Sequence, residues 1–308
     1  MLFIKVGIKF DFYFLFCLLA LPLHHASTYK TTMGIIIGID VGGSTTKIVG
    51  LNKGNLQSPM FITAADPVTS LFGAFGKYVY DNGFNLSDIE QVMITGVGSA
   101  YIEGPLYGLP TMKADEFKSD GLGARYGSNM DKLIVVSMGT GTSYVKVIGN
   151  SIKHIGGISI GGGTLQGLAL LLLKTRDFVK ICDLAVKGNI SNVNLQIRDI
   201  CKHDLEGLPL DATASLFGKV ANSNASDEDV ALGLIYMVLQ SIGSSAILSA
   251  LNTDIKDFVM IGNLTKFPQC AELFPFMESV YNVRFHIPPY AEFRTALGAA
   301  LSYPGAGE

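Results

Sequence analysis

A short apolar strand that runs into a glycine turn and then into a second strand occurs twice in this chain, about 100 residues apart. The first copy turns at Gly42-Gly43 and the second at residues 139–142 (GTGT). Two short strands around a glycine turn are typical of a β-hairpin. The expected strands cover residues 35–39 and 45–51 in the first copy, and 133–137 and 143–148 in the second. The repeat predicts an internal duplication in which each half begins with a hairpin.

The rest of the apolar pattern indicates an α/β chain with two related lobes. Helical spacing is expected over residues 68–80 and 165–173, in further stretches up to about residue 250, and in a closing helix over 292–301. Strands are expected over residues 91–95 and 258–261. We place the first lobe at residues 33–130 and the second at residues 131–308.

The glycine turns carry the residue types that bind nucleotide phosphates. Without a Cβ, glycine lets backbone N–H groups approach phosphate oxygens, and hydroxyl side chains add donors. Asp40 to Lys47 (DVGGSTTK) supplies a carboxylate for hydrated Mg²⁺, three hydroxyls and a cation, and Gly139 to Thr142 supplies a second set. Gly161 to Thr164 begins a helix, where free N–H groups favour an anion. The P-loop and dinucleotide-binding glycine patterns are both missing from the sequence.

Charge and cysteine content exclude several other classes of protein. The formal net charge is −3 and the sequence has no run of Lys and Arg, so we expect no nucleic-acid partner. Beyond residue 32 the cysteines are Cys182, Cys201 and Cys270, which are far apart and form no CxxC motif. This spacing predicts neither a disulfide framework nor a zinc site.

Residues 230–251 form an apolar, nearly uncharged segment behind Ser226 to Asp229, which resembles a helix capping box. The segment is long enough to suggest a membrane span. Gln240 and several small residues within it favour a helix buried in the core or in a dimer interface, so we expect no membrane partner. We expect a homodimer, because one small lobe does not easily bury so apolar a helix.

Residues 1–32 have the shape of a secretory signal, with the apolar run Phe12 to Leu23 behind Lys5 and Lys9. That run is too short to span a membrane. Met33, however, opens the nucleotide-binding pattern, which needs cytosolic ATP. A glycosylation sequon at Asn263 also falls in an expected nucleotide loop. We therefore expect a cytoplasmic protein that begins at Met33, with residues 1–32 a mis-assigned start or else a signal-like segment.

Three stretches together resemble the actin, hexokinase and heat-shock-ATPase superfamily, and more narrowly the type II pantothenate kinases. They are GIDVGGSTTKIVG, MGTGTS and GGISIGGGTLQGL, and the triple glycine with its Gln-Gly-Leu continuation is the narrowest signal. The resemblance extends from Gly34 to Leu301. It implies two duplicated actin/hexokinase-like ATPase lobes with the nucleotide in the cleft between them.

The resemblance also implies roles for individual residues. Asp40 would help to hold Mg²⁺, and Thr140 would contact phosphate. The ATP phosphates would lie against Gly42, Gly43, Ser44, Thr45, Thr46 and Lys47. Further nucleotide contacts would come from Gly162, Gly163, Thr164, Leu165, Gln166, Phe178 and Asn263.

The family's catalytic carboxylate aligns with Glu116, and Asp115 is the alternate. The primary hydroxyl of pantothenate must lose its proton as it bonds to the γ-phosphate of ATP, and a carboxylate can accept that proton. The resemblance thus implies ATP-dependent phosphorylation of pantothenate to 4′-phosphopantothenate, the first step of coenzyme A biosynthesis. Coenzyme A or an acyl-CoA is a possible feedback ligand, as it is for some members of the family.

One departure from the family pattern concerns the substrate end of the site. Many type II enzymes place an arginine before the Gly-Gly of the second lobe, where it contacts the pantothenate carboxylate. Here His154 takes that position. A neutral imidazole is a weaker carboxylate partner than a bidentate guanidinium. Lys153 and Arg125 are the cations that could compensate.

Three other functions fit the same scaffold. A sugar or other small-hydroxyl kinase is the first, although the Asn-Asp-type motif typical of such enzymes is not matched. An ATPase that activates a dehydratase is the second, and it would need paired cysteines for an iron–sulfur cluster. A filament-forming protein is the third, and it would need long insertions that this chain lacks.

Overall fold

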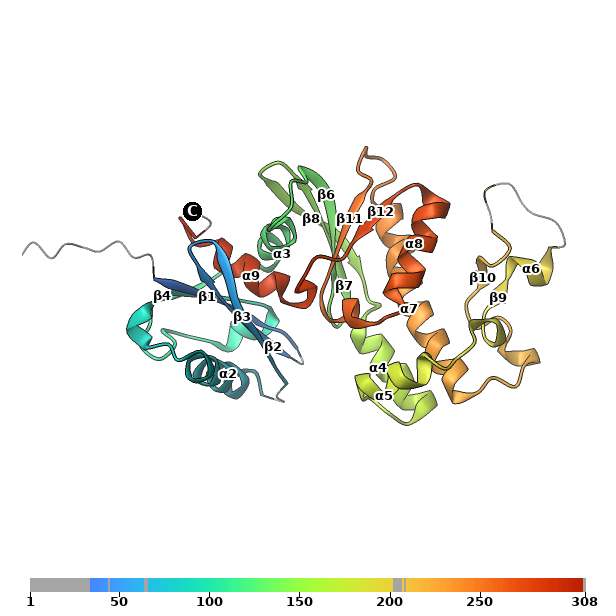
Figure 1. Ribbon diagram of the computed structural model, residues 1–308, viewed down its shortest axis with the longest axis horizontal. Helices are drawn as coiled ribbons and strands as arrows, with labels where there is room; N and C mark the ends of the chain where they lie inside the picture. The colour runs from blue at the N-terminus through green and yellow to red at the C-terminus, as the bar shows by residue number, and fades with distance from the viewer. Residues whose placement is uncertain (1–33, 44, 64–65, 202–206, 208, 307–308) are drawn as a thin grey trace, which may run out of the picture. The chain divides into compact units, whose positions relative to one another are not determined.

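A computed structural model of the chain describes residues 34–43, 45–63, 66–201, 207 and 209–306 (Figure 1). The predicted leader at residues 1–32 and Ser44 of the first glycine loop lie outside the described residues.

The first sheet forms around a fully buried strand. Every residue of β1 (Ile35–Val41) is buried, as expected of a central strand, and β2 (Thr46–Asn52) pairs with it antiparallel through the glycine turn. The predicted hairpin is therefore confirmed. The strand order is β3-β2-β1-β4-β5, in which β1, β4 and β5 are parallel. The other three strands are β3 (Asn55–Ile62), β4 (Ile89–Thr95) and β5 (Thr111–Lys113).

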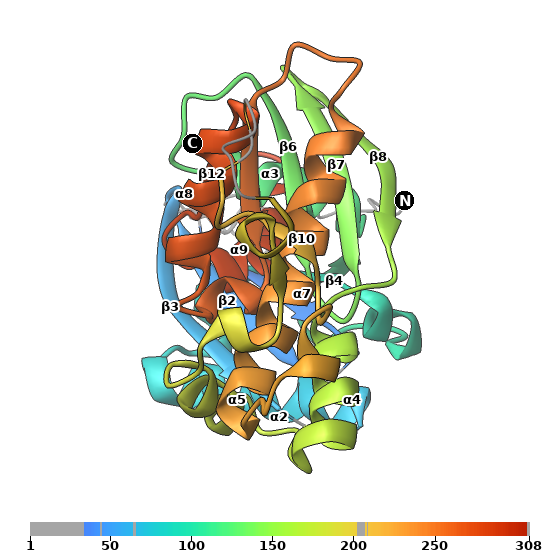
Figure 2. The ribbon, with the colours of Figure 1, turned by 90° about the vertical axis from the view of Figure 1, so that its right-hand side faces the viewer.

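The second sheet repeats this topology strand for strand. Its order is β8-β7-β6-β11-β12 (Figure 2). The pairs β6–β7 and β7–β8 are antiparallel, whereas β6, β11 and β12 run parallel to one another. Each strand thus has a counterpart in the first sheet, as the predicted duplication requires. Its strands are β6 (Lys132–Met138), β7 (Thr142–Ile148), β8 (Ser151–Ile158), β11 (Asp257–Ile261) and β12 (Arg284–His286).

Helices cover both faces of the first sheet. On one face lies α2 (Pro67–Asn82), which Asp66 caps by accepting a bond from the Thr69 amide at 2.6 Å. On the other face lies α9 (Arg294–Leu301), whose alanines pack against β1, β2 and β4. We had grouped this closing helix with the second lobe by sequence position, but its apolar contacts are with the first sheet.

The helix α3 (Glu116–Arg125) covers one face of the second sheet and also packs against α9. Both helices are seen between the two sheets in Figure 1. The two backbones touch where they cross, because a Cβ built on Gly298 would lie 1.7 Å from the Ser119 carbonyl oxygen. The α3–α9 crossing therefore connects the two sheets through glycine contacts.

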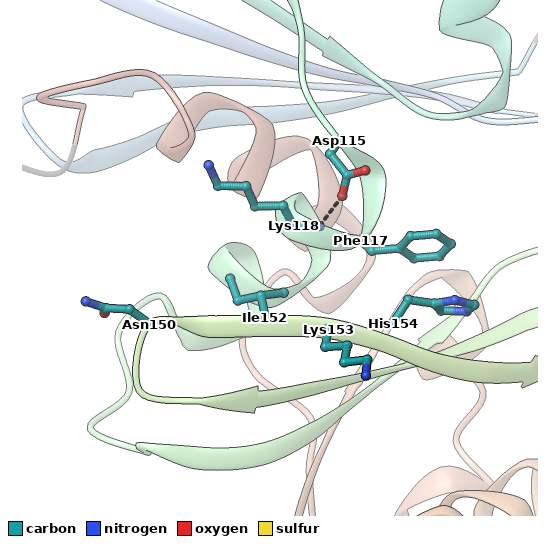
Figure 3. Close-up of a pocket in the computed structure, with 7 residues that line it drawn as sticks. All are labelled: Asp115, Phe117, Lys118, Asn150, Ile152, Lys153 and His154. Atoms are coloured by element: carbon teal, nitrogen blue, oxygen red, sulfur yellow. Dashed lines mark hydrogen bonds between the residues drawn. The ribbon is translucent and has the colours of Figure 1, made fainter.

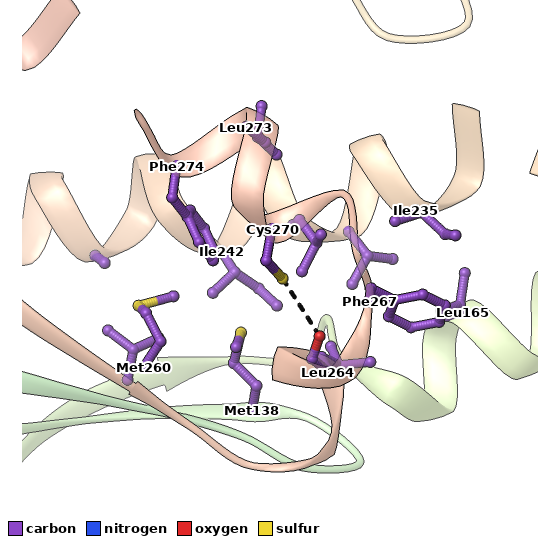
Figure 4. Close-up of a cluster of buried hydrophobic side chains, with 14 of the residues drawn as sticks. Met138, Leu165, Ile235, Ile242, Met260, Leu264, Phe267, Cys270, Leu273 and Phe274 are labelled. Carbon is purple, nitrogen blue, oxygen red and sulfur yellow. Dashed lines mark hydrogen bonds between the residues drawn. The ribbon is translucent and has the colours of Figure 1, made fainter. Parts of the chain in front are cut away.

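The other face of the second sheet carries the largest apolar core (Figure 4). The helix α7 (Asp227–Ser249) runs through this core and is capped by Ser226 as predicted. By length and composition α7 could cross a membrane, yet 56% of its most apolar window is buried within the chain, as in a core helix. More than half of this window is therefore covered without a second copy of the chain. The neighbouring helices are α4 (Gly162–Leu173), α5 (Phe178–Ala185) and α8 (Cys270–Tyr281).

Residues 190–222 differ from the predicted run of helices. Asparagine side chains there bond to backbone groups, as Asn194 does in accepting from the Phe217 amide at 3.0 Å, and such bonds compete with helix formation. The elements of this segment are η3 (Ile190–Asn192), β9 (Leu195–Gln196), α6 (Ile197–Ile200), β10 (Thr213–Ser215) and η4 (Val220–Asn222). The remaining short helices are η1 (Leu86–Asp88), η2 (Val97–Tyr101), η5 (Asn263–Lys266) and η6 (Ala291–Phe293).

Candidate functional site

A buried ion pair lies at the carboxyl end of β1. The hairpin register places Asp40 opposite Lys47, and Lys47 Nζ lies 3.1 Å from Asp40 Oδ2, with both side chains less than 10% exposed. Gly96, after β4, adopts φ +87°, and a Cβ there would lie 2.5 Å from Asp40 Oδ1. Glycine is thus required at this position, which the sequence reasoning did not include in the site.

The predicted base begins α3. The Asp115 side chain is the N-cap of the helix and accepts a bond from the Lys118 amide at 2.7 Å, so this carboxylate already has a structural role. Glu116, the next residue, is half-buried. Burial raises the pKa of the Glu116 carboxyl, the negative charges of Asp40 and Asp115 raise it further, and Lys47 opposes them. The Glu116 carboxyl is thus near enough to the Asp40–Lys47 pair to be affected by both charges.

The two hairpin loops lie opposite each other. A Cβ built on Gly43 would be 3.8 Å from the hydroxyl of Thr140, which is exposed at the tip of the second loop. Gly42 tightens the first loop by donating its N–H to the Thr45 carbonyl at 2.9 Å. The Thr46 hydroxyl is bonded instead to Ser70 at 2.8 Å and is buried, so it does not face the opposite loop.

The three glycines at the start of α4, which we predicted to offer free N–H groups to an anion, are explained instead by close packing. The amides of Gly162 and Gly163 donate to the carbonyls of Gly139 and Thr140 at 2.8 and 2.9 Å, so they are not free to bind an anion. A Cβ on Gly161 would lie 2.6 Å from the Thr140 carbonyl oxygen. The glycines therefore allow the first turn of α4 to pack directly on the second loop.

The other predicted nucleotide contacts on α4 and α5 differ in how deeply they are buried. Leu165 is 2% exposed and belongs to the apolar core, and Thr164 donates its hydroxyl to the Ser159 carbonyl at 3.2 Å. Gln166 is half-buried on the same turn. Phe178 packs against Phe267, with ring centroids 4.1 Å apart.

Asn263 follows β11 at a tight backbone contact. Gly262 has φ +97°, and a Cβ on it would lie 2.4 Å from the Met138 carbonyl oxygen, so the loop rests on the end of β6. The Asn263 Oδ1 atom is buried without a hydrogen-bond partner among the described residues. A buried polar atom of this kind is costly unless a ligand or water completes it.

A cavity of about 480 Å³ lies between the start of α3 and β8 (Figure 3). The His154 ring stacks on Phe117 in it, with centroids 4.0 Å apart and planes 14° from parallel. Lys153 lies opposite Lys146 in the register of β7 and β8. Its side chain extends from the side of β8 away from His154 (Figure 3). Arg125 donates to the Gly149 carbonyl at 2.6 Å. Among the described residues, neither predicted compensating cation is therefore placed beside the His154 ring.

A buried carboxyl group, Asp120, was missed by the sequence reasoning. It lies one helical turn after Glu116 in α3 and is fully buried, and its Oδ1 accepts a bond from the Thr295 hydroxyl of α9 at 2.7 Å. The spacing of four residues places both carboxyls on one face of a helix, which was the available signal. Thr295 could not be found in this way, because only the tertiary fold brings α9 to α3.

No group of three or more His, Cys, Asp or Glu side chains suited to a metal was found in the described part of the chain. Asp40 nevertheless fits a Mg²⁺ that keeps most of its water. Mg²⁺ is commonly held by one or two carboxylates together with substrate phosphates. The residues present thus fit a metal that arrives with a nucleotide, and they do not form a cage of their own.

Comparison with known proteins gives two kinds of match. The Fumble family matches residues 123–277. The chain is 30% identical over 274 residues to the type II pantothenate kinase of Staphylococcus aureus strain USA300, with 85% of this chain and 97% of that protein covered. The enzyme of the same name from the bovine strain RF122 is 29% identical over the same length.

Solved structures with this fold include an activator and a kinase. The activator of the 2-hydroxyisocaproyl-CoA dehydratase from Clostridium difficile, with bound ADPNP, has a TM-score of 0.63 at 18% identity, covering 87% of this chain and 93% of that chain. A ROK family glucokinase from Streptomyces griseus, in complex with glucose and AMPPNP, has a TM-score of 0.54 at 13% identity, covering 87% and 98%. These likenesses confirm the predicted two-lobed α/β fold.

Proposed function

This chain belongs to the type II pantothenate kinases, and from that premise we propose that it transfers the γ-phosphoryl group of ATP to the primary hydroxyl of pantothenate. The observation that carries the proposal is the half-buried Glu116 carboxyl, close enough to Asp40 and Lys47 for their charges to change its pKa. A carboxylate, a buried ion pair and two facing glycine loops are the parts that phosphoryl transfer to a hydroxyl needs.

We assign the proton-accepting role to Glu116. The hydroxyl oxygen of pantothenate forms a bond to the γ-phosphorus, the bond from that phosphorus to the β,γ-bridging oxygen breaks, and ADP leaves with the electron pair. The hydroxyl proton passes to the Glu116 carboxylate. Its raised pKa supports this role, because a base accepts a proton more readily when its pKa lies nearer the working pH.

We assign phosphate binding to the two loops and metal binding to Asp40. Gly43 and Thr45 would contribute a backbone N–H and a hydroxyl on one side, and Thr140 a hydroxyl on the other, while Gly42 holds the first loop closed through its bond to the Thr45 carbonyl. Bound Mg²⁺ would neutralise part of the charge on the ATP phosphates, with Asp40 holding its hydration shell. Lys47 forms an ion pair with Asp40 and would add a second positive charge beside the bound phosphates.

The proposal is tested by following ADP release with ATP, Mg²⁺ and one acceptor at a time. Pantothenate should stimulate release strongly, whereas glucose should not stimulate it above the rate without an acceptor. Stimulation by glucose and not by pantothenate would identify a sugar kinase. Equal release with and without every acceptor would favour an ATPase, as expected of a dehydratase activator.

His154 provides a prediction about the acceptor end of the site. Replacing His154 with Arg should lower the KM for pantothenate about 3- to 10-fold, because a guanidinium stacks on Phe117 and binds a carboxylate through two hydrogen bonds. Steady-state kinetics at saturating ATP measure this change. Pantetheine, which has an amide in place of the carboxylate, should not share the gain.

Lys153→Ala is the matched control, since Lys153 lines the same cavity but its side chain leaves the strand on the side away from His154. It should change the KM for pantothenate by less than about twofold, as expected for an exposed charge outside the contact. An equal gain for pantothenate and pantetheine in His154→Arg would contradict the assignment of His154 to the carboxylate.

We further propose that the protein is a cytoplasmic homodimer and that coenzyme A or an acyl-CoA regulates it. Because more than half of the apolar window of α7 is covered within one chain, the stronger support for a dimer comes from α4, where Leu170, Leu171 and Leu172 are 43%, 67% and 52% exposed. Consecutive exposed leucines of this kind mark interaction surfaces more often than free surface.

A further inference from the structure

The buried carboxyl of Asp120 has no place in the reaction as described above. Its side chain is fully buried in α3, one turn below Glu116. Oδ1 accepts a hydrogen bond from the Thr295 hydroxyl at 2.7 Å. Oδ2 makes no close hydrogen bond among the described residues, although the Ser137 hydroxyl is near enough to favour the charged form of the carboxyl. An ionised carboxylate with an unpartnered oxygen in a dry site is costly, whereas the protonated form carries no charge to desolvate.

The charged groups around Asp120 also disfavour a second buried anion. Glu116 on the same helix and Asp40 at the end of β1 are both carboxyls close enough to act on it. Lys47, the cation of this cluster, is paired with Asp40. From α9, the Arg294 guanidinium is turned away.

The bonds of Arg294 show where that guanidinium is engaged. It donates to the carbonyls of Gly123, Tyr126 and Pro289. From β6, Ser137 presents a hydroxyl to Asp120 and no charge. The described groups that act on Asp120 are thus two carboxyls and two hydroxyls.

Protonation of the most buried carboxyl resolves this imbalance. Burial is the main cause that raises the pKa of Asp120 to about 7, and the charges of Glu116 and Asp40 add to the effect. The hydroxyls of Thr295 and Ser137 act in the opposite direction. Below about pH 7 Asp120 is therefore neutral, and Glu116 can be the ionised member of the pair.

We propose that Asp120 is a positioning residue for phosphoryl transfer, which as a neutral carboxylic acid joins α9 to the helix that carries Glu116 and which weakens nucleotide binding when it ionises. The Asp120–Thr295 bond joins the helices near the Gly298 contact, so it fixes the start of α3 relative to the first sheet. The inference rests on the proposed function for the role of Glu116, but its effect on nucleotide binding does not depend on the acceptor.

The consequence is a nucleotide affinity that depends on pH. As the pH rises through 7, Asp120 gains a negative charge near Asp40 and Glu116, where the nucleotide phosphates are expected to bind. One added charge at this range, partly screened, should weaken binding about fivefold. Asp120→Asn keeps the shape of the side chain and cannot ionise, so this variant should bind nucleotide without that loss.

The experiment measures the Kd of the full chain for MgADP by calorimetry at intervals from pH 6 to 8.5. The ratio of the wild-type Kd to the Asp120→Asn Kd should rise about fivefold across this range. The ionisation of the nucleotide itself is common to both proteins and cancels in the ratio. Asp115→Asn, which removes an exposed carboxylate near Glu116 and keeps a helix cap, should give a constant ratio.

Thr295→Val tests the same group without changing Asp120. Loss of the hydroxyl that favours the charged form should move the midpoint of the wild-type transition to higher pH. This variant supplies the answer if Asp120→Asn does not fold. A constant ratio for Asp120→Asn, or an unmoved midpoint for Thr295→Val, would overturn the proposal.

Measurements of kcat distinguish a positioning role of Asp120 from a role in packing alone. Asp120→Ala should lower kcat for pantothenate phosphorylation at pH 6.5 about tenfold, with Asp120→Asn restoring most of it, because asparagine can still accept from Thr295. Equal losses in both variants would contradict the positioning role. If pantothenate is not phosphorylated at all while the MgADP ratio still changes with pH, the proposed function fails and the assignment of Asp120 to nucleotide binding stands.

Discussion

Replacing Glu116 with Gln should lower kcat for pantothenate phosphorylation by about 10²- to 10⁴-fold and should not weaken the binding of MgADP. Glutamine has the size of glutamate but cannot accept the hydroxyl proton. The change also removes a negative charge close to Asp40 and Lys47, so nucleotide binding should not weaken. Steady-state kinetics with saturating pantothenate and calorimetry with MgADP measure the two quantities.

Asp115→Asn is the matched control for this prediction. Asn caps a helix as well as Asp does, so the start of α3 should keep its geometry. Its kcat should stay within about twofold of the wild-type value, as expected for a carboxylate that takes no part in proton transfer. Comparable losses in both variants would assign the base role jointly to the pair, and a large loss in Asp115→Asn alone would reverse our choice.

Gly298→Ala should destabilise the fold by about 3 kcal/mol or more, a large effect for one methyl group. A Cβ at this position would lie 1.7 Å from the Ser119 carbonyl oxygen. A Cβ on Gly123 would in turn lie 1.8 Å from the Arg294 carbonyl oxygen, so α3 and α9 touch through backbone on both sides. Neither helix can move away without separating Glu116 from the sheet that ends in Asp40.

Gly167→Ala serves as the control, because Gly167 lies inside α4 with open space where its Cβ would be. That substitution should stabilise the protein by about 0.5 to 1 kcal/mol through helix propensity alone. Urea denaturation of the two variants and the wild type measures the free energies of unfolding. A stability of Gly298→Ala equal to that of the wild type would show that the helices cross with more room than the structure gives them.

Much of the fold could be predicted because it depends on local sequence. The hairpins of β1 and β2 and of β6 and β7 follow from apolar strands around glycine turns, and α7 follows from its cap at Ser226. The candidate site was predictable for the same reason, since Asp40, Lys47 and the two loops lie at the ends of those strands.

What could not be predicted depends on contacts between distant segments. The backbone of the second loop takes the amides of Gly162 and Gly163, and no local pattern reveals that pairing. The packing of α9 on the first sheet, and the bond from Thr295 to Asp120 that results from it, join residues 175 positions apart. The family resemblance therefore pointed to Glu116 as the candidate base and gave no role to Asp120.

Transfer of the γ-phosphate to pantothenate is tested most directly by following a label on that phosphate into the products. The full chain is incubated with Mg²⁺, pantothenate and ATP labelled with ³²P at the γ-position, and the products are separated by chromatography. We expect the label to appear in phosphopantothenate and the Glu116→Gln protein to form it at least about 10²-fold more slowly. Label that appears only as inorganic phosphate, at a rate independent of pantothenate, would contradict this expectation.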